Sequence, residues 1–173
     1  DNHRDDLIFE MAMKEDFPGW GNMLEKGNGT FFEDWECRGS ALHSSYLYIG
    51  SWFIEALGGI RRTESGYKQF IIEPWITEKG SQQVRSHYNS MYGNIESNWA
   101  VNSGVLNLEV TVPANTTAIL KLSDIDLETL KEGDSIWKEA KGVSLYMQKG
   151  KAISLALQSG TYRFSVTMNS GVQ

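Results

Sequence analysis

The sequence predicts an α+β protein in which a short helical part is followed by an antiparallel β-sandwich of about eight strands. Two observations carry this prediction. Apolar residues recur at spacings of three and four up to about residue 57, whereas later segments alternate apolar with polar residues, and these are the periods of helices and of strands. Gly58-Gly59 separates the two regions and is typical of a helix end. We therefore expect two domains, 1–60 and 61–173.

Three helices are expected in the first domain. Helical spacing runs from Asp5 to Met13, and Pro18 ends it because proline cannot continue the interior of a helix. A short second helix is expected at Trp20–Glu25. The strongest signal covers Ser40–Leu57, where apolar side chains occupy most of the helix circumference. Such a helix is normally buried on several sides, so we expect it to require partners beyond these sixty residues.

The second domain is expected to contain strands joined by tight turns. Asn102-Ser-Gly104 supplies the Asn and Gly that a hairpin turn needs at positive φ. In Val105–Val112 the apolar residues alternate with polar ones, as in a sheet with one wet face. The expected strands are Gln69–Glu73, Gln82–Tyr92, Asn94–Val101, Val105–Val112, Thr117–Leu122, Val143–Tyr146, Ala152–Leu157 and Thr161–Thr167.

Composition excludes several classes of function. A net charge of −6 without a cluster of Lys or Arg argues against a nucleic-acid partner, which requires a basic face. No stretch is long and apolar enough for a membrane span. The single cysteine, Cys37, allows no intrachain disulfide, and neither it nor His3, His43 and His87 has metal-ligand spacing. We therefore expect no cofactor and no metal.

The first residues contain neither an initiator Met nor the basic and apolar regions of a signal peptide. We therefore expect the chain to begin within a longer protein.

Four features resemble the rhamnosidases of glycoside hydrolase family seventy-eight. Phe17–Gly27 looks like the family's Pro-x-Trp-Gly-x-Met-x-x-x-Gly stretch, and Gly29–Trp35 is similar to its Gly-Ala-Thr-Thr-x-Trp-Glu-x-Trp motif. Ser40–His43 is similar to its Ser-x-Asn-His motif. His87–Trp99 together with Val112–Ala118 resembles the first hairpins of its C-terminal sandwich. The resemblance covers nearly the whole chain.

This resemblance implies the closing helices of an (α/α)6 catalytic barrel, followed by the β-sandwich, in a bacterial inverting α-L-rhamnosidase. The implied partners are a rhamnose-containing glycoside or polysaccharide and the missing N-terminal part of the same enzyme. A periplasmic or extracellular location is favoured over a cytoplasmic one. The natural glycoside, the linkage cleaved and the oligomeric state are left open.

Inverting glycosidases use two carboxyl groups, about 6.5–9.5 Å apart, as general acid and general base. The resemblance assigns the base to Glu33, and Phe31, Phe32 and Trp35 are expected to desolvate it partly, which raises its affinity for a proton. Judged by its residues alone, Glu33 is more often a solvated surface acid than a catalytic base. Asp34 and Glu36 are its rivals, but alternate side chains of an extended segment point in opposite directions.

Three further residues are candidates for binding the substrate. The resemblance implies that His43 donates a hydrogen bond to a sugar hydroxyl, although an isolated His there more often serves the start of a helix. Trp35 and Trp20 are candidates for stacking on the apolar face of a sugar.

The family's general acid lies in an upstream motif that this sequence does not reproduce, so we expect the 173 residues alone to be inactive. Two alternatives remain open at this point. In the first, the sandwich is a non-catalytic carbohydrate-binding module and the helices serve as a stalk. In the second, the chain is the tail of another α-barrel glycosidase or lyase.

Overall fold

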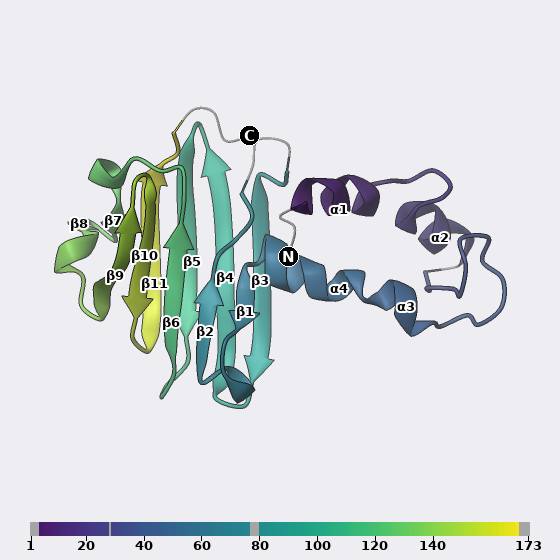
Figure 1. Ribbon diagram of the computed structural model, residues 1–173, viewed down its shortest axis with the longest axis horizontal. Helices are drawn as coiled ribbons and strands as arrows, with labels where there is room; N and C mark the ends of the chain where they lie inside the picture. The colour runs from purple at the N-terminus through teal and green to yellow at the C-terminus, as the bar shows by residue number, and fades with distance from the viewer. Residues whose placement is uncertain (1–3, 28, 77–79, 170–173) are drawn as a thin grey trace. The chain divides into compact units, whose positions relative to one another are not determined.

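The computed structural model describes residues 4–27, 29–76 and 80–169 (Figure 1). The chain divides into two compact units, Asp1–Phe53 and Ile54–Gln173. The first is built from helices and loops, and the second is built around two β-sheets. Among the described helices, none combines the length and the apolar character that crossing a bilayer requires.

The first unit opens with α1 (Asp5–Ala12) and α2 (Trp20–Lys26), which confirm the two short helices expected from the sequence. Met23 of α2 is completely buried. The backbone N–H of Phe32 lies 3.4 Å from the Met23 sulfur, so the loop after α2 folds back onto this helix.

The single helix expected from Ser40 to Leu57 is wrong in its extent. Helical structure begins four residues later and is divided into α3 (Ser44–Leu47), α4 (Ile49–Trp52) and the π-helical turn η1 (Phe53–Leu57). The indole N–H of Trp52 donates to the carboxylate of Asp5 at 2.8 Å, which joins α4 to the start of α1.

Ser40–His43 is not helical because its backbone groups are already committed elsewhere. The N–H of Glu33 donates to the Ser40 carbonyl at 3.1 Å, and the N–H of His43 donates to the Phe31 carbonyl at 2.9 Å. These bonds hold residues 40–43 beside Phe31–Glu33, so the helix begins only at Ser44. The apolar residues Leu47, Tyr48 and Phe53 of the helical part remain exposed.

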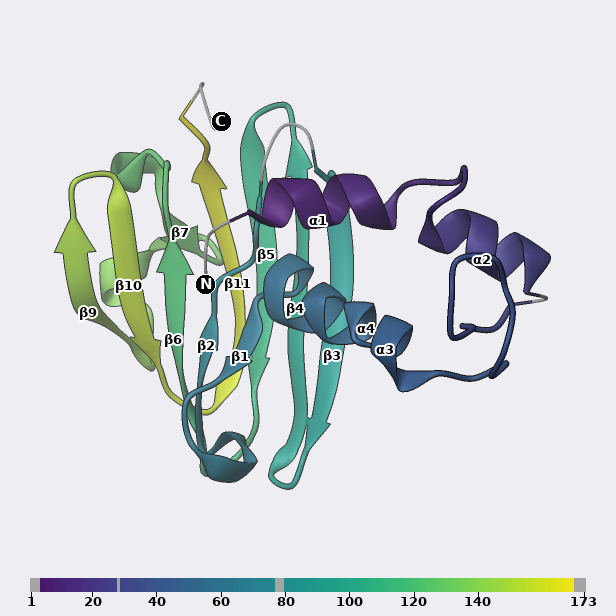
Figure 2. The same ribbon diagram turned by 45° about the vertical axis from the view of Figure 1, so that its right-hand side comes forward.

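The second unit consists of two stacked sheets (Figures 1 and 2). Their strand orders are β1-β2-β6-β10-β9 and β3-β4-β5-β11-β7-β8. The strands are β1 (Ile60–Arg62), β2 (Gln69–Ile72), β3 (Gln83–Ser90), β4 (Gly93–Asn102), β5 (Val105–Val112), β6 (Thr117–Leu122), β7 (Lys131–Glu132), β8 (Ser135–Ile136), β9 (Val143–Lys149), β10 (Ala152–Leu157) and β11 (Gly160–Thr167). Short 3-10 helices are η2 (Ser65–Tyr67), η3 (Leu127–Thr129) and η4 (Trp137–Glu139).

All eight strands expected from the sequence are present. The three strands that the sequence did not predict are β1, β7 and β8, because runs of two or three residues are too short to show alternation. The recorded strand pairs are antiparallel except β2 with β6, which run parallel from Gln69 opposite Thr117 to Ile72 opposite Leu120.

The core lies between the two sheets. The buried side chains of β5 are Leu106, Leu108, Val110 and Val112, as the alternating pattern predicted. Inward residues of β2, β6 and β10 meet them from the other sheet. A large apolar surface is thereby removed from water, and this burial is the main force that stabilises the sandwich.

Gly58-Gly59 ends the helical turn as expected and leads directly into β1. Gly59 has a φ of +70°, and a Cβ atom there would collide with the Glu73–Pro74 backbone. The indole N–H of Trp99, buried in the core, donates to the Leu57 carbonyl at 2.8 Å. One of the carbonyls that a helix end leaves without a helical partner is thus satisfied inside the sandwich.

Leu120→Ala should lower the free energy of unfolding of the sandwich by about 2–5 kcal/mol, because it leaves a cavity at a completely buried position of β6. Urea denaturation followed by β-sheet circular dichroism measures this loss. The matched control is Leu145→Ala in β9 of the same sheet, where the side chain is 52% exposed, and its effect should stay within about 0.5 kcal/mol. Equal losses in the two variants would contradict the assigned core.

Candidate functional site

The two motifs that the sequence singled out lie side by side in one loop of the first unit. Residues 30–33 run next to residues 40–43, joined by the two backbone hydrogen bonds between Glu33 and Ser40 and between His43 and Phe31. The Thr30 hydroxyl adds a bond of 2.5 Å to the Ala41 carbonyl. The intervening residues 34–39 form a closed loop, which we call the acidic loop.

The Glu33 carboxylate is anchored to the end of the acidic loop. Its Oε2 accepts a hydrogen bond of 3.1 Å from the backbone N–H of Ser40. Gly39, with a φ of +71°, makes this approach possible, because a Cβ atom there would lie 2.5 Å from Oε2. The side-chain direction of Glu33 is therefore set by the backbone of residues 39 and 40.

The surroundings of Glu33 differ from the expectation in two ways. Its side chain is exposed and is not enclosed by Phe31, Phe32 and Trp35. Phe32 instead lies against the position of Gly27, where a Cβ atom would stand 2.7 Å from the ring.

The expected extended conformation is wrong for residues 34–37. They form a turn closed by the Cys37 N–H, which donates to the Asp34 carbonyl at 3.1 Å. The side-chain directions in this segment follow from the turn and not from strand alternation.

Arg38 forms ion pairs with the two rival carboxylates. Its guanidinium Nε lies 3.1 Å from Oδ2 of Asp34, and its Nη2 lies 3.4 Å from Oε2 of Glu36. The backbone N–H of Arg38 donates to Asp34 and holds the pKa of that carboxyl below its usual range, the guanidinium adds to this lowering, and desolvation opposes it. In the described part of the chain, Glu33 has no such ion pair.

Three aromatic side chains cluster beside this loop. The rings of Trp20 and Trp35 meet edge to face with centroids 5.2 Å apart, and Tyr46 of α3 lies 4.5 Å from Trp35. The indole N–H of Trp20 donates to the Tyr46 carbonyl at 3.3 Å. The structure thus brings both predicted tryptophans together, half-buried, and packs them against each other.

Sequence reasoning missed Tyr46. Its spacing of three from His43, within an expected helix, was a usable signal, because residues three apart share a helix face. His43 itself is half-buried and lies directly before α3, at the start of the helical structure. Across the described ranges, no three His, Cys, Asp or Glu side chains are grouped so that they could hold a metal ion.

Two family models match the chain. The bacterial alpha-L-rhamnosidase 6 hairpin glycosidase domain matches residues 1–57, and the bacterial alpha-L-rhamnosidase C-terminal domain matches residues 59–136.

Curated relatives and a solved structure agree with these matches. Two proteins from Formosa agariphila named alpha-L-rhamnosidase are 29% and 30% identical to the chain over 92% and 91% of its length. The chain spans 18% and 17% of their lengths. The crystal structure of Streptomyces avermitilis alpha-L-rhamnosidase complexed with L-rhamnose is similar with a TM-score of 0.80 and 23% identity, covering 95% of this chain and 16% of that one. The chain therefore belongs to the bacterial α-L-rhamnosidase family.

Proposed function

We propose that the chain is the C-terminal part of an enzyme that removes terminal α-L-rhamnose from a glycoside or polysaccharide by inverting hydrolysis. Residues 1–60 then supply the closing helices of an (α/α)6 barrel, and residues 61–173 form the C-terminal sandwich. The missing N-terminal part of the enzyme is the partner of the helices. The exposed apolar side chains of Leu47, Tyr48 and Phe53 support this partnership, because buried barrel helices are apolar on several sides. For the bacterial enzyme, a periplasmic or extracellular location stays a prediction.

The observation that carries the catalytic proposal is the division of charge in the acidic loop. A general base must offer an accessible carboxylate oxygen to the attacking water, and an oxygen engaged by a cation is less accessible. Arg38 holds Asp34 and Glu36, whereas Glu33 is exposed and is fixed by a single backbone N–H on Oε2. Glu33, which directly precedes this loop, is therefore the carboxylate that is both positioned and accessible.

In the proposed reaction, Glu33 takes a proton from the attacking water, and Oε1 is the oxygen that the Ser40 hydrogen bond leaves available. The water attacks the anomeric carbon on the face opposite the leaving group, which inverts the configuration. The general acid that protonates the departing oxygen comes from a part of the enzyme outside these 173 residues. His43 donates to a sugar hydroxyl, and the Trp20–Trp35 pair, supported by Tyr46, supplies the apolar contact.

The 173 residues alone should not hydrolyse an aryl α-L-rhamnoside, because inverting hydrolysis needs both carboxyl groups. The release of the aryl alcohol by the isolated chain is the measurement, with the complete enzyme as the positive control. Clear turnover by the chain alone would refute the proposal that one carboxyl group lies in this chain and the other in a different part of the enzyme.

In the complete enzyme, Glu33→Ala should lower kcat for the same substrate by about 10²–10⁴-fold, because general base catalysis contributes a factor of this size. Asp34→Asn and Glu36→Gln are matched controls within the same loop, and each should cost less than about tenfold. If either control is more severely affected than Glu33→Ala, the base is assigned to the wrong carboxylate.

Added azide provides a readout that a purely structural role would not change. Azide is a nucleophile that needs no base, so it should restore the release of the aryl alcohol by Glu33→Ala and yield a glycosyl azide of inverted configuration. Nuclear magnetic resonance of the product gives its configuration. A variant that azide does not restore, or a product that retains the configuration, would contradict the proposed role of Glu33.

Arg38→Gln should raise the pKa of Asp34 part of the way towards its ordinary range, because the guanidinium is lost while the backbone N–H of residue 38 remains. A carboxylate with a lowered pKa stabilises the folded loop above its unfolded pKa, and this contribution is lost as the pH falls through the folded pKa. NMR titration of the Asp34 carboxyl carbon measures the change. Arg163→Gln, which removes the partner of Glu109 in the sandwich, is the control and should leave Asp34 unchanged.

A further inference from the structure

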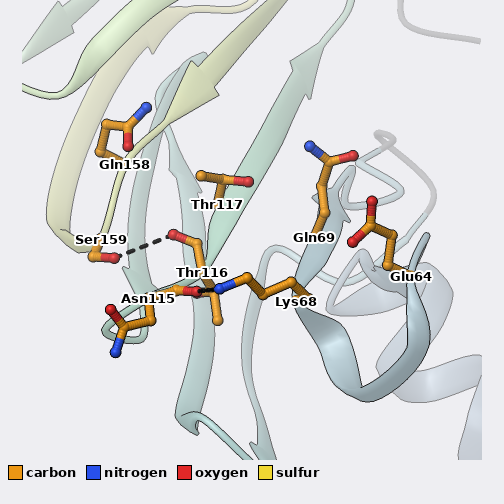
Figure 3. Close-up of a pocket in the computed structure, with 8 residues that line it drawn as sticks. All are labelled: Glu64, Lys68, Gln69, Asn115, Thr116, Thr117, Gln158 and Ser159. Carbon is orange, nitrogen blue, oxygen red and sulfur yellow. Dashed lines mark hydrogen bonds between the residues drawn. The ribbon is translucent and has the colours of Figure 1, made fainter.

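The second unit contains a polar pocket that the proposed hydrolysis does not use. It has a volume of about 450 Å³ and lies where β2 and β6 begin and β10 ends (Figure 3). Two of its walls come from Lys68-Gln69 and from Asn115–Thr117. The second of these belongs to the Val112–Ala118 stretch, which the sequence singled out and which catalysis does not explain.

A row of uncharged polar side chains crosses three strands at this pocket. Gln69 is paired with Thr117 across the parallel β2–β6 ladder, and Gln158 directly follows the end of β10 beside β6. These three residues lie on the outward side of the sheet, because their neighbours Phe70, Ala118 and Leu157 are buried in the core. No hydrogen bond joins their side-chain amides or hydroxyl to another described residue. The amide and hydroxyl groups of these side chains can therefore both donate hydrogen bonds to a ligand and accept them from it.

The frame beneath this row is fixed by hydrogen bonds. The ammonium group of Lys68 donates to the Asn115 carbonyl, and the Thr117 N–H donates to the Lys68 carbonyl at 3.2 Å. The Ser159 hydroxyl donates to the Thr116 carbonyl at 3.1 Å (Figure 3). The walls are held before any ligand arrives, so binding costs little ordering of the backbone.

The charges of the pocket favour a neutral ligand. Among the described residues that line the pocket, Lys68 and Glu64 are the charged ones, and their charges cancel. The ammonium group is also engaged with the Asn115 carbonyl and lies 5.2 Å from the centre of the Tyr92 ring. Among the described lining residues, an anion would meet only the ammonium group of Lys68, whose charge Glu64 offsets, whereas amide and hydroxyl groups match the hydroxyls of a sugar.

An apolar surface adjoins the polar row on the same side of the sheet. Two residues further along the strands, Ile71 is paired with Ile119, which is paired in turn with Ala156. These side chains are half-buried and lie about 7 Å from the polar row, given the rise of a strand. A saccharide has the matching character, with hydroxyl groups at the rim of its ring and C–H groups on its faces.

We propose that this pocket is a second, non-catalytic binding site for a neutral saccharide unit, recognised by Gln69, Thr117 and Gln158. The site lies wholly within the sandwich, and its occupation involves no bond breaking. It is independent of Glu33, so its existence does not depend on the proposed hydrolytic mechanism. Because the pocket is open and offers few polar contacts, a dissociation constant of roughly millimolar is expected.

The test is a titration of the ¹⁵N-labelled 173-residue chain with L-rhamnose, followed by two-dimensional NMR. Saturable shifts are expected for the amides of residues 64–69, 115–117 and 158–159. The double variant Thr117→Val with Gln158→Ala should raise the dissociation constant at least about tenfold, because two hydrogen-bonding groups are lost while the β-branched shape at residue 117 is kept. Gln148→Ala on the exposed strand β9 is the matched control and should change it by less than about twofold.

Several results would overturn the proposal. These are shifts confined to residues 33–46, the absence of saturation at tens of millimolar sugar, or equal weakening by Gln148→Ala. Inorganic phosphate is the anionic probe, and tighter binding of phosphate than of L-rhamnose at these residues would also overturn the assignment to a neutral saccharide. A failure here leaves the Glu33 experiments unaffected, because those measure turnover by the complete enzyme.

Discussion

The buried hydrogen bond from the Trp99 indole to the Leu57 carbonyl is the constraint on which the entry to the sandwich depends. It satisfies a carbonyl at the end of the helical turn inside an apolar core, where an unpaired group is costly. The next two residues are glycines because the space beside them is too small for a side chain. A Cβ atom at Gly58 would collide with Ser86, and one at Gly59 would collide with the Glu73–Pro74 backbone. The start of β1 follows from this fixed point.

The carboxylates in and next to the acidic loop have different binding partners although they are close in the sequence. Arg38 lies four residues after Asp34 and two after Glu36, and the turn brings its guanidinium within reach of both. Glu33 lies just before this turn and is held by the backbone of Ser40 instead. The environment of each group, and not its identity, thus separates the proposed base from its rivals.

The sandwich was largely predictable from the sequence, whereas the loop geometry was not. The strands Val105–Val112 and Ala152–Leu157 could be read from alternation because one of their faces is buried, which links the pattern to the fold. The start of α3 was misplaced because Ser40–His43 has helical spacing but makes backbone bonds to residues 31–33, which no local pattern reveals. Glu33 and His43 were proposed as site residues through a family resemblance, and their roles stay predictions. The pairing of Tyr46 with Trp35, and the engagement of Asp34 and Glu36 by Arg38, depend on contacts that appear only once the chain is folded.

The parallel pairing of β2 with β6 has a consequence for how the sandwich assembles. The chain leaves the five-stranded sheet after β2, builds the β3–β4–β5 meander in the opposite sheet, and then returns to place β6 beside β2. The pairing of β2 with β6 therefore closes a long loop that contains the meander, and the loop-closure entropy is lost before these distant contacts form. Folding of the sandwich should accordingly be slower than folding of a meander built only from strands that are neighbours in the sequence.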